Sequence, residues 1–287
     1  MRICSSIAEV RAEVCAACSD SRAANKLLGL VPTMGALHEG HISLVRLAKK
    51  KCDVVAASIF VNPTQFGPTE DLAKYPRQLE RDRELLEKEG VDILFAPSVE
   101  EMYPGRSVTW VVVEGLSDKL DGRSRPGHFR GVTTVVSKLF HIIQPQVAYF
   151  GQKDAAQLAV IRRMVRDLRF PVEIVAAPII REPDGLAMSS RNAYLNKEER
   201  VRALVLQRSL RSVQGHFESG ERSATKLISA AREVFGSEPS VKIDYIEIVN
   251  PDSLDPIDTI SGEALLAVAA YVGNTRLIDN VILRRAK

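Results

Sequence analysis

The stretch that decides the fold is Val31–Lys50, VPTMGALHEGHISLVRLAKK. The apolar run 26–31 leads into it and predicts a β-strand, and the amphipathic end of the stretch predicts a helix that begins near Gly40. A helix N-terminus that faces a strand end offers unpaired N–H groups and a positive dipole end, so this turn suits phosphate. Gly35 and Gly40 let the backbone come close to a ligand.

Two histidines, His38 and His41, lie three residues apart in this stretch. Imidazoles there can donate hydrogen bonds to phosphate oxygens without placing a permanent full charge in the site. HxxH alone also fits a pair of surface loop histidines or a zinc site. The zinc site is incomplete, because no third ligand stands in a HExxH-like frame.

Length and composition describe an ordinary globular chain. The 287 residues suit one large or two smaller domains, and 45% are hydrophobic while 26% are charged. A formal charge of +3, evenly spread, argues against nucleic acid as a partner. No apolar run approaches the ~20 residues of a membrane span, and the first residues lack a signal-peptide core, so we expect a cytoplasmic protein.

Cys15 and Cys18 form a CxxC pair, which is compatible with a redox or metal site. They lie within a helical pattern of apolar residues, and there is no second CxxC in the sequence. We therefore predict buried thiols on a helix.

Apolar runs alternate with helix-like segments over most of the chain. Near-continuous apolar runs are typical of parallel strands that helices cover on both faces. The predicted strands are 26–31, 53–61, 91–97, 147–150 and 172–180, with a β-rich run at 107–113. The predicted helices are 7–23, the one beginning near residue 40, a charged helix after Pro76 within 70–89, 132–143 and 155–168. We predict an α/β fold, with a Rossmann-like parallel-sheet domain over residues 1–180.

The alternation of strand and helix stops at about Arg181, and the rest of the chain predicts a small α+β lid domain over residues 181–287. Gly273-Asn274 between two apolar runs predicts a hairpin. The elements expected here are helices 197–217 and 224–235 and strands 241–249, 264–272 and 275–283.

Polar residues follow two more of the predicted strands, where open α/β sheets keep their ligand groups. Asn62 and Gln65 follow one strand and can bind a small polar substrate through their amides. The run Gly151-Gln152-Lys153-Asp154 follows another, as a second phosphate-facing corner in which Lys153 is a mobile point charge. Asp154 suits a helix cap or a ribose contact, and Gln157, one turn on, could face the substrate.

Two loops add further cations and hydroxyls. Residues 120–131 hold three arginines and three glycines, which predicts either a solvated basic loop or a mobile flap that meets an anion. Ser189, Ser190 and Arg191 form a compact phosphate-binding loop or, alternatively, a cap before a helix. A P-loop and a GxGxxG motif are absent from the sequence, which disfavours a P-loop kinase and a Rossmann dehydrogenase.

These motifs resemble those of a known family. PTMGALHEGH is similar to the HxGH-type signature of the nucleotidyltransferase superfamily in the form found in pantothenate synthetases (pantoate–β-alanine ligases). The motifs SIFVNPTQFGP, YPR, GHFRGV, GQKD and MSSRN extend the resemblance across both predicted domains, as far as residues 273–280. The resemblance implies the conversion of ATP, pantoate and β-alanine to AMP, pyrophosphate and pantothenate through a pantoyl-adenylate.

The resemblance also implies residue roles. ATP is expected at 34–41, with His38 and His41 on the phosphates, at 151–154, and at the loop that closes over the triphosphate. In full, the expected nucleotide contacts are Met34, Gly35, Ala36, Leu37, His38, Glu39, Gly40, His41, Gly151, Gln152, Lys153, Asp154, Ile180, Met188, Ser189, Ser190 and Arg191. Gln65 and Gln157 are expected to hold pantoate, with Asn62 beside them, and Asp82 matches a position linked to Mg²⁺.

The resemblance implies a homodimer, with residues 53–61 or the neighbouring strands as a possible interface. One departure is Gln152, where the family commonly has glutamate. Two other interpretations remain at this point: a different adenylyltransferase of the same superfamily, and a nucleotide-sensing or scaffold protein that kept the fold. Intact His38, His41, Lys153 and Arg191 argue against the second of these.

Overall fold

The computed structural model describes residues 1–18, 26–68 and 70–285. The chain forms two compact units, of which the first comprises Met1–Asp118, Arg125–Gly151 and Val160–Ala177. The second unit comprises Lys119–Ser124, Gln152–Ala159 and Pro178–Lys287. It therefore takes in two short segments from the middle of the chain, which a single boundary at 180/181 does not provide for.

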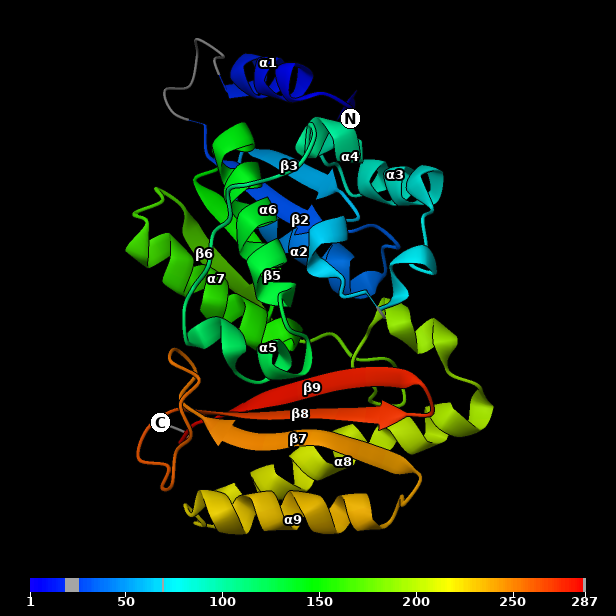
Figure 1. The fold of residues 1–287 in the computed structure, drawn as a ribbon, viewed down its shortest axis with the longest axis vertical. Coiled ribbons are helices and arrows are strands. Elements are labelled where there is room, and N and C mark those ends of the chain that lie inside the picture. The colour runs from blue at the N-terminus through cyan, green and yellow to red at the C-terminus, as the bar shows by residue number, and fades with distance from the viewer. Residues whose placement is uncertain (19–25, 69, 286–287) are drawn as a thin grey trace. The chain divides into compact units, whose positions relative to one another are not determined.

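The first unit contains a six-stranded parallel sheet in the order β1-β4-β3-β2-β5-β6 (Figure 1). Its strands are β1 Arg2–Cys4, β2 Leu28–Thr33, β3 Val54–Ile59, β4 Ile93–Phe95, β5 Val147–Gly151 and β6 Glu173–Ala177. The predicted Rossmann-like sheet is confirmed. Because β2 and β5 are neighbours in the sheet but far apart in sequence, the topological switch point lies at their carboxyl ends, where such sheets bind ligands.

Helices lie on both faces of this sheet (Figure 1). They are α1 Ile7–Cys18, α2 Glu39–Lys51, α3 Leu79–Lys88, α4 Val99–Met102, α6 His128–Ile143 and α7 Ala155–Asp167, with 3₁₀ turns η1 Pro63–Gln65, η2 Asp71–Ala73 and η3 Leu116–Asp118. Val31, Val55 and Tyr149 pack in one cluster with apolar side chains of α2 and α3. Their sequence neighbours Leu30 and Ala148 are equally buried, and because side chains alternate along a strand they pack on the other face.

Two sequence expectations differ from this unit. Residues 107–113 form no strand: the segment runs extended beside α6, bonded through Val111 to the hydroxyls of Thr133 and Thr134, and Val108 is 82% exposed. The charged helix expected after Pro76 is α3, which begins at Leu79. Cys15 lies on α1 as predicted but is exposed, and residues 19–23 of the predicted first helix lie outside the described residues.

The structure does not favour residues 53–61 as a dimer interface, whereas the alternative, an interface at the neighbouring strands, stays a prediction. In the sheet, β3 pairs with β2 on one edge and β4 on the other, and Val54–Ala57 are buried. An internal strand has no open edge or face to offer a second subunit.

Among the residues that the structure describes, no helix has the length and apolarity needed to cross a bilayer.

The second unit contains an antiparallel sheet in the order β7-β8-β9 and two long helices. Its elements are α5 Asp121–Ser124, η4 Gln152–Asp154, η5 Ser190–Tyr194, α8 Lys197–Glu218, α9 Ala224–Gly236, β7 Val241–Val249, β8 Ala264–Val272 and β9 Thr275–Leu283. The predicted hairpin is confirmed, because Val272 pairs with Thr275 across the turn.

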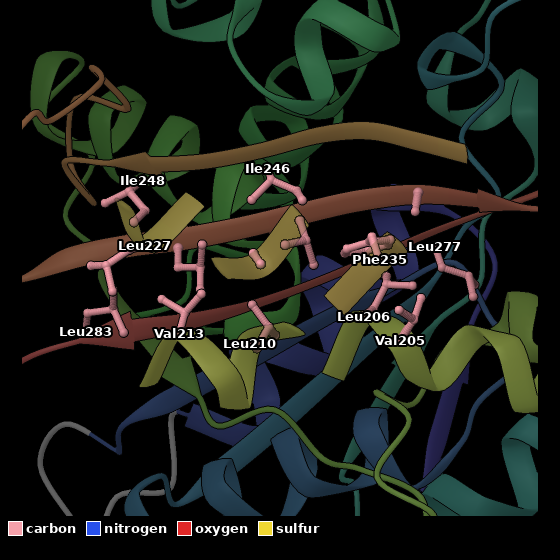
Figure 2. Packing of buried hydrophobic residues seen from close by; sticks show 14 of the residues in the cluster. Val205, Leu206, Leu210, Val213, Leu227, Phe235, Ile246, Ile248, Leu277 and Leu283 are labelled. Atoms are coloured by element: carbon pink, nitrogen blue, oxygen red, sulfur yellow. The ribbon is translucent and has the colours of Figure 1, made fainter. Parts of the chain in front are cut away.

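The core of this unit lies between the two helices and one face of the sheet (Figure 2). Leu206, Leu210 and Val213 of α8 meet Leu227 of α9 and Ile246 of β7 there. Alternate residues of the strands supply the sheet side, as the period of two requires. This packing fixes β9, which lies at the edge of the sheet and whose Asp279 and Asn280 bond to Arg181 and Lys153.

Candidate active site

The corner after β2 is a tight left-handed turn. Gly35 and Ala36 have φ of +84° and +50°, a region that glycine enters freely and alanine only at a cost. The turn is held from within, because the Gly35 N–H donates to Thr33 Oγ1 at 3.2 Å and that hydroxyl donates to Ser58 O at 2.8 Å. These bonds tie the corner to the ends of β2 and β3.

Asp82 of α3 supplies the strongest support for the same corner. Its side chain is fully buried, and its two oxygens accept hydrogen bonds from the backbone N–H groups of Ala36 and Leu37 at 2.7 and 2.8 Å. Burial raises the pKa of Asp82 above its usual value, against the lowering effect of these two bonds. Asp82 therefore fixes the unusual backbone that precedes the histidines.

His38 and His41 begin helix α2, with His38 at the N-cap. The Gly40 N–H donates to His38 Nδ1 at 3.2 Å, and the His38 N–H donates to His41 Nδ1 at 3.4 Å. The two ring centroids are 4.1 Å apart. Because each Nδ1 accepts a hydrogen bond, the neutral rings carry their protons on Nε2. The start of α2 thus carries two imidazole N–H groups beside the helix N-terminus, an arrangement that suits an anion.

Other residues of 34–41 have different surroundings. Leu37 is a core residue packed with α2 and α3, so only its backbone could reach a nucleotide. Glu39 is exposed and forms an ion pair with Arg46. The side chains of Leu37 and Glu39 are therefore engaged elsewhere in the protein, and a nucleotide contact predicted for these two residues would have to involve their backbone.

The loop after β3 meets the same corner through Gln65. Gln65 Nε2 lies 2.8 Å from Met34 Sδ, and its Oε1 accepts from Asn62 Nδ2 at 3.2 Å. Asn62 donates its second amide N–H to Gly131 O at 3.1 Å, and its Oδ1 accepts from Tyr103 at 2.9 Å. With both N–H groups engaged inside the protein, Asn62 acts here as a support for Gln65 rather than as a substrate contact.

Local sequence reasoning missed a second support for Gln65. His128 Nδ1 donates to the Gln65 carbonyl at 2.8 Å, and Arg125 donates to His128 Nε2 at 3.1 Å. Arg125 in turn forms a two-bond pair with Glu70, at 2.6 and 2.8 Å. These contacts form a continuous polar chain from Glu70 to the predicted substrate glutamine.

The proposed mobile flap at 120–131 is not supported by the structure. The segment is helical at α5 and again from the start of α6. Arg123 pairs with Glu247 at 2.5 Å, and Arg130 stacks over Trp110. With Arg125 paired to Glu70, all three arginines have protein partners, so this segment is not a reservoir of unpaired cations.

In the second unit, the corner after β5 forms the 3₁₀ turn η4. Lys153 Nζ lies 3.5 Å from Asp154 Oδ1, a long contact that does not hold the ammonium tightly. Gln157 is half-buried one turn further on, in α7. Gln152 donates from its amide to Asn280 Oδ1 at 3.2 Å.

The Ser-Ser-Arg loop follows a small hairpin of the second unit. The Met188 N–H donates to Ile180 O at 2.9 Å, and Arg181 bridges to Ala187. Ser189 caps η5, where its Oγ accepts from the Arg191 N–H at 3.3 Å. The cap alternative is thus partly right, since Ser189 caps a helix, although a 3₁₀ helix; that the loop binds phosphate stays a prediction.

Each unit brings part of the predicted site together. The first gathers 34–41, Asn62 and Gln65 at the strand ends, while the second carries Lys153, Gln157 and the hairpin that leads to Ser189–Arg191. That both groups enclose one triphosphate stays a prediction.

Magnesium at Asp82 does not fit this structure. The carboxylate is 0% exposed and holds two backbone N–H groups, which an ion would have to displace. Among residues 1–18, 26–68 and 70–285, no cluster of three or more His, Cys, Asp or Glu side chains could hold a metal ion.

The fold and the corner after β2 define a class of protein. It is a Rossmann-like α/β protein in which the HxxH pair lies at the start of α2, the helix that follows β2 at the topological switch point. A model of the pantoate-β-alanine ligase family matches residues 2–282, so the chain belongs to that family.

Individual relatives agree with this assignment. A pantothenate synthetase of Acidobacterium capsulatum is 63% identical over 256 residues, covering 89% of this chain and 86% of the relative. The crystal structure of pantothenate synthetase from Thermus thermophilus has a TM-score of 0.92 and 49% identity, covering 99% of this chain and 100% of that one. A pantoate-β-alanine ligase from Francisella tularensis, solved with β-γ ATP and β-alanine, has a TM-score of 0.79 and 34% identity, covering 100% of this chain and 99% of that one.

Proposed function

We propose that this chain condenses pantoate with β-alanine at the expense of ATP, forming pantothenate and releasing AMP and pyrophosphate. The observation that carries the proposal is the family match over residues 2–282, together with an intact pair of Nε2 donors at the helix N-terminus. The Francisella tularensis relative, whose crystal structure contains β-γ ATP and β-alanine, supports both the nucleotide and the amine.

The chemistry needs alignment more than covalent catalysis. A carboxylate is a poor electrophile, so pantoate attacks the α-phosphorus of ATP, the bond to pyrophosphate breaks, and a pantoyl-adenylate forms. The amine of β-alanine then attacks the acyl carbon, and AMP leaves. The protein has to hold the reactants in line and to neutralise charge that builds up on phosphorus and on the leaving group.

The residue roles in this proposal rest on the family resemblance, and the contacts within each unit support them. His38 and His41 donate to phosphate oxygens from Nε2, and Gln65, held by Asn62 and His128, binds pantoate. Lys153 adds a mobile positive charge, and the loop through Ser189 and Arg191 donates to the triphosphate. Gln157 is the second pantoate contact.

Three further features belong to the proposal. ATP enters with Mg²⁺ bound chiefly by its own phosphates and water, a mode that this ion commonly uses. The protein works in the cytoplasm, where ATP is supplied. It forms a homodimer through a surface other than the internal strand β3, which light scattering at several protein concentrations would test.

The decisive test is isotope exchange. With pantoate and without β-alanine, the enzyme should move labelled pyrophosphate into ATP, because adenylation is reversible. In the complete reaction the nucleotide product should be AMP. No exchange with pantoate, or ADP as product, would reject the proposal and favour another adenylyltransferase or a kinase-type reaction.

A further inference from the structure

Two successive polar residues, Asp279 and Asn280, are buried in the edge strand β9. Each is only 3% exposed, on a strand whose other buried residues are chiefly apolar. Buried polar side chains persist where hydrogen bonds offset the loss of water. Their partners therefore show what these side chains do.

Asn280 holds the turn that carries Lys153. Its Nδ2 donates to the backbone carbonyls of Gln152 and Lys153 at 3.0 and 2.8 Å, and its Oδ1 accepts from the Gln152 side chain at 3.2 Å. Both amide hydrogens are thereby used on two successive carbonyl groups. The direction in which the Lys153 side chain leaves the backbone is set by this contact.

Asp279 holds the hairpin that leads to the Ser-Ser-Arg loop. Its two oxygens accept from Arg181 Nη1 and Nη2 at 2.6 and 3.0 Å, a bidentate pair. Arg181 Nη1 also donates to Gly185 O at 3.1 Å, which braces the hairpin from inside. Ser189 follows directly, after Met188 has bonded back to Ile180.

We call the Asn280 bonds to residues 152–153 and the Asp279 bonds to Arg181 the two clamps, and these clamps are connected to each other. They are neighbours on one strand, and the Asn280 N–H donates to Asp279 Oδ1 at 2.8 Å. The strand is in turn fixed by its ladder with β8, where Val268 pairs with Asp279 and Ala267 with Asn280. A single rigid point of β9 thus holds two segments that lie far apart in the sequence, one around residue 153 and the other around residue 189.

We propose that Asp279 and Asn280 are positioning residues for adenylation, which set the spacing between Lys153 and the Ser189–Arg191 loop. This inference rests on the proposed function. It predicts that damage to the clamps slows the step that uses the triphosphate far more than the step that uses the finished adenylate.

The test substitution is Asn280→Asp, which keeps the shape but replaces two N–H donors by an oxygen that faces carbonyl groups. We measure pantoate-dependent pyrophosphate exchange and, separately, pantothenate formation from synthetic pantoyl-adenylate and β-alanine. In the variant, kcat/KM for ATP in the exchange should fall by about 10²-fold, as a small misplacement of reactive groups does. The second half-reaction should stay close to wild type. Asn274→Asp, the same change at the exposed hairpin turn, is the matched control and should leave both rates unchanged.

A merely structural role would lower both half-reactions together, through loss of folded enzyme, so an unchanged ratio of the two rates overturns the inference. If Asn280→Asp does not fold, Arg181→Lys decides. It keeps the positive charge but loses the bidentate fork, and should lower the exchange by about tenfold while sparing the second step. Wild-type enzyme without any exchange would refute the proposed function itself, whereas wild-type exchange in a folded Arg181→Lys or Asn280→Asp variant refutes only the clamp.

Discussion

Replacing Asp82 with Asn tests how the histidine corner is held. The wild-type carboxylate accepts from two successive backbone N–H groups, of Ala36 and Leu37, in a site without solvent exposure. An asparagine offers one oxygen to one N–H group and turns its own NH₂ towards the other. One charge-assisted bond is lost, and one buried donor is left without an acceptor.

The size of the effect follows from these two losses. A hydrogen bond to a charged group contributes about 1.5–3 kcal/mol, and an unsatisfied buried donor costs about 1–3 kcal/mol. The neutral amide avoids the desolvation that raises the pKa of Asp82, which offsets part of the loss. We expect the free energy of unfolding of the first unit to fall by about 2–4 kcal/mol. At pH 7 this lowers the Tm by roughly 5–10 °C.

The measurement combines thermal unfolding with pyrophosphate exchange over a range of Mg²⁺ concentrations. Because Ala36 and Leu37 precede the histidines, exchange should fall by about 10²-fold, and added Mg²⁺ should not restore it. Glu84→Gln, at an exposed position of the same helix, is the control and should behave like wild type. Recovery of exchange at high Mg²⁺ would show that Asp82 acts as a metal ligand. Wild-type stability in Asp82→Asn would refute the hydrogen-bond argument.

Two further predictions concern the support of Gln65 and the packing beneath it. Burial acts to raise the pKa of Glu70, but the bonds from Arg125 outweigh burial and hold the pKa below its usual value. The Glu70–Arg125 pair therefore stabilises the fold fully at pH values above the unfolded pKa of Glu70, and this stabilisation is lost as the pH falls through the lower folded pKa. The stability advantage of wild type over Glu70→Gln, measured by urea unfolding, should therefore be present at pH 7 and decline as the pH falls below the unfolded value of about 4.3; an advantage that grows in acid would contradict this sign. Gly131→Ala should destabilise by about 3 kcal/mol or more in the same assay, because an added Cβ would lie 2.4 Å from Thr64 O. Gly215→Ala, in α8 with nothing within 4 Å of the added Cβ, should instead stabilise by up to about 1 kcal/mol; a similar cost at both glycines would refute the steric argument.

Much of the fold could be predicted from hydrophobic pattern alone. The buried runs that form β2, β3 and β5 are apolar on both faces, as expected for strands of a sheet that helices cover on both sides. The hairpin at Gly273-Asn274 was readable for a local reason, since its turn residues are adjacent in the chain. The β-rich run at 107–113 was misread because β propensity depends on a strand partner, and this segment instead bonds to threonines of α6.

The site was predictable in its residue types but not in its partners. Asp82 is one of several acids in a charged segment, and nothing near it in sequence shows that a turn 45 positions earlier needs two acceptors. Likewise, His128 and Asn280 hold backbone groups 63 and 127 positions away. Contacts of this kind leave no periodic trace, because a backbone carbonyl is present at every residue.

The arginines of 120–131 also have partners that the local sequence does not show. Counted locally they make a cationic loop, but Arg125 pairs with an acid 55 residues away and Arg123 with one 124 residues away. A partly buried guanidinium in a bidentate pair is not available to a triphosphate unless the pair breaks and leaves a carboxylate unpaired, at a cost of several kcal/mol. While its pair with Glu70 holds, Arg125 is therefore not available to a triphosphate, and we predict that Lys153, whose contact with the Asp154 carboxylate is long, supplies positive charge there. We therefore expect a change at Asn280, which bonds to the backbone on both sides of the Lys153 Cα, to slow adenylation more than the loss of the Arg125 charge would.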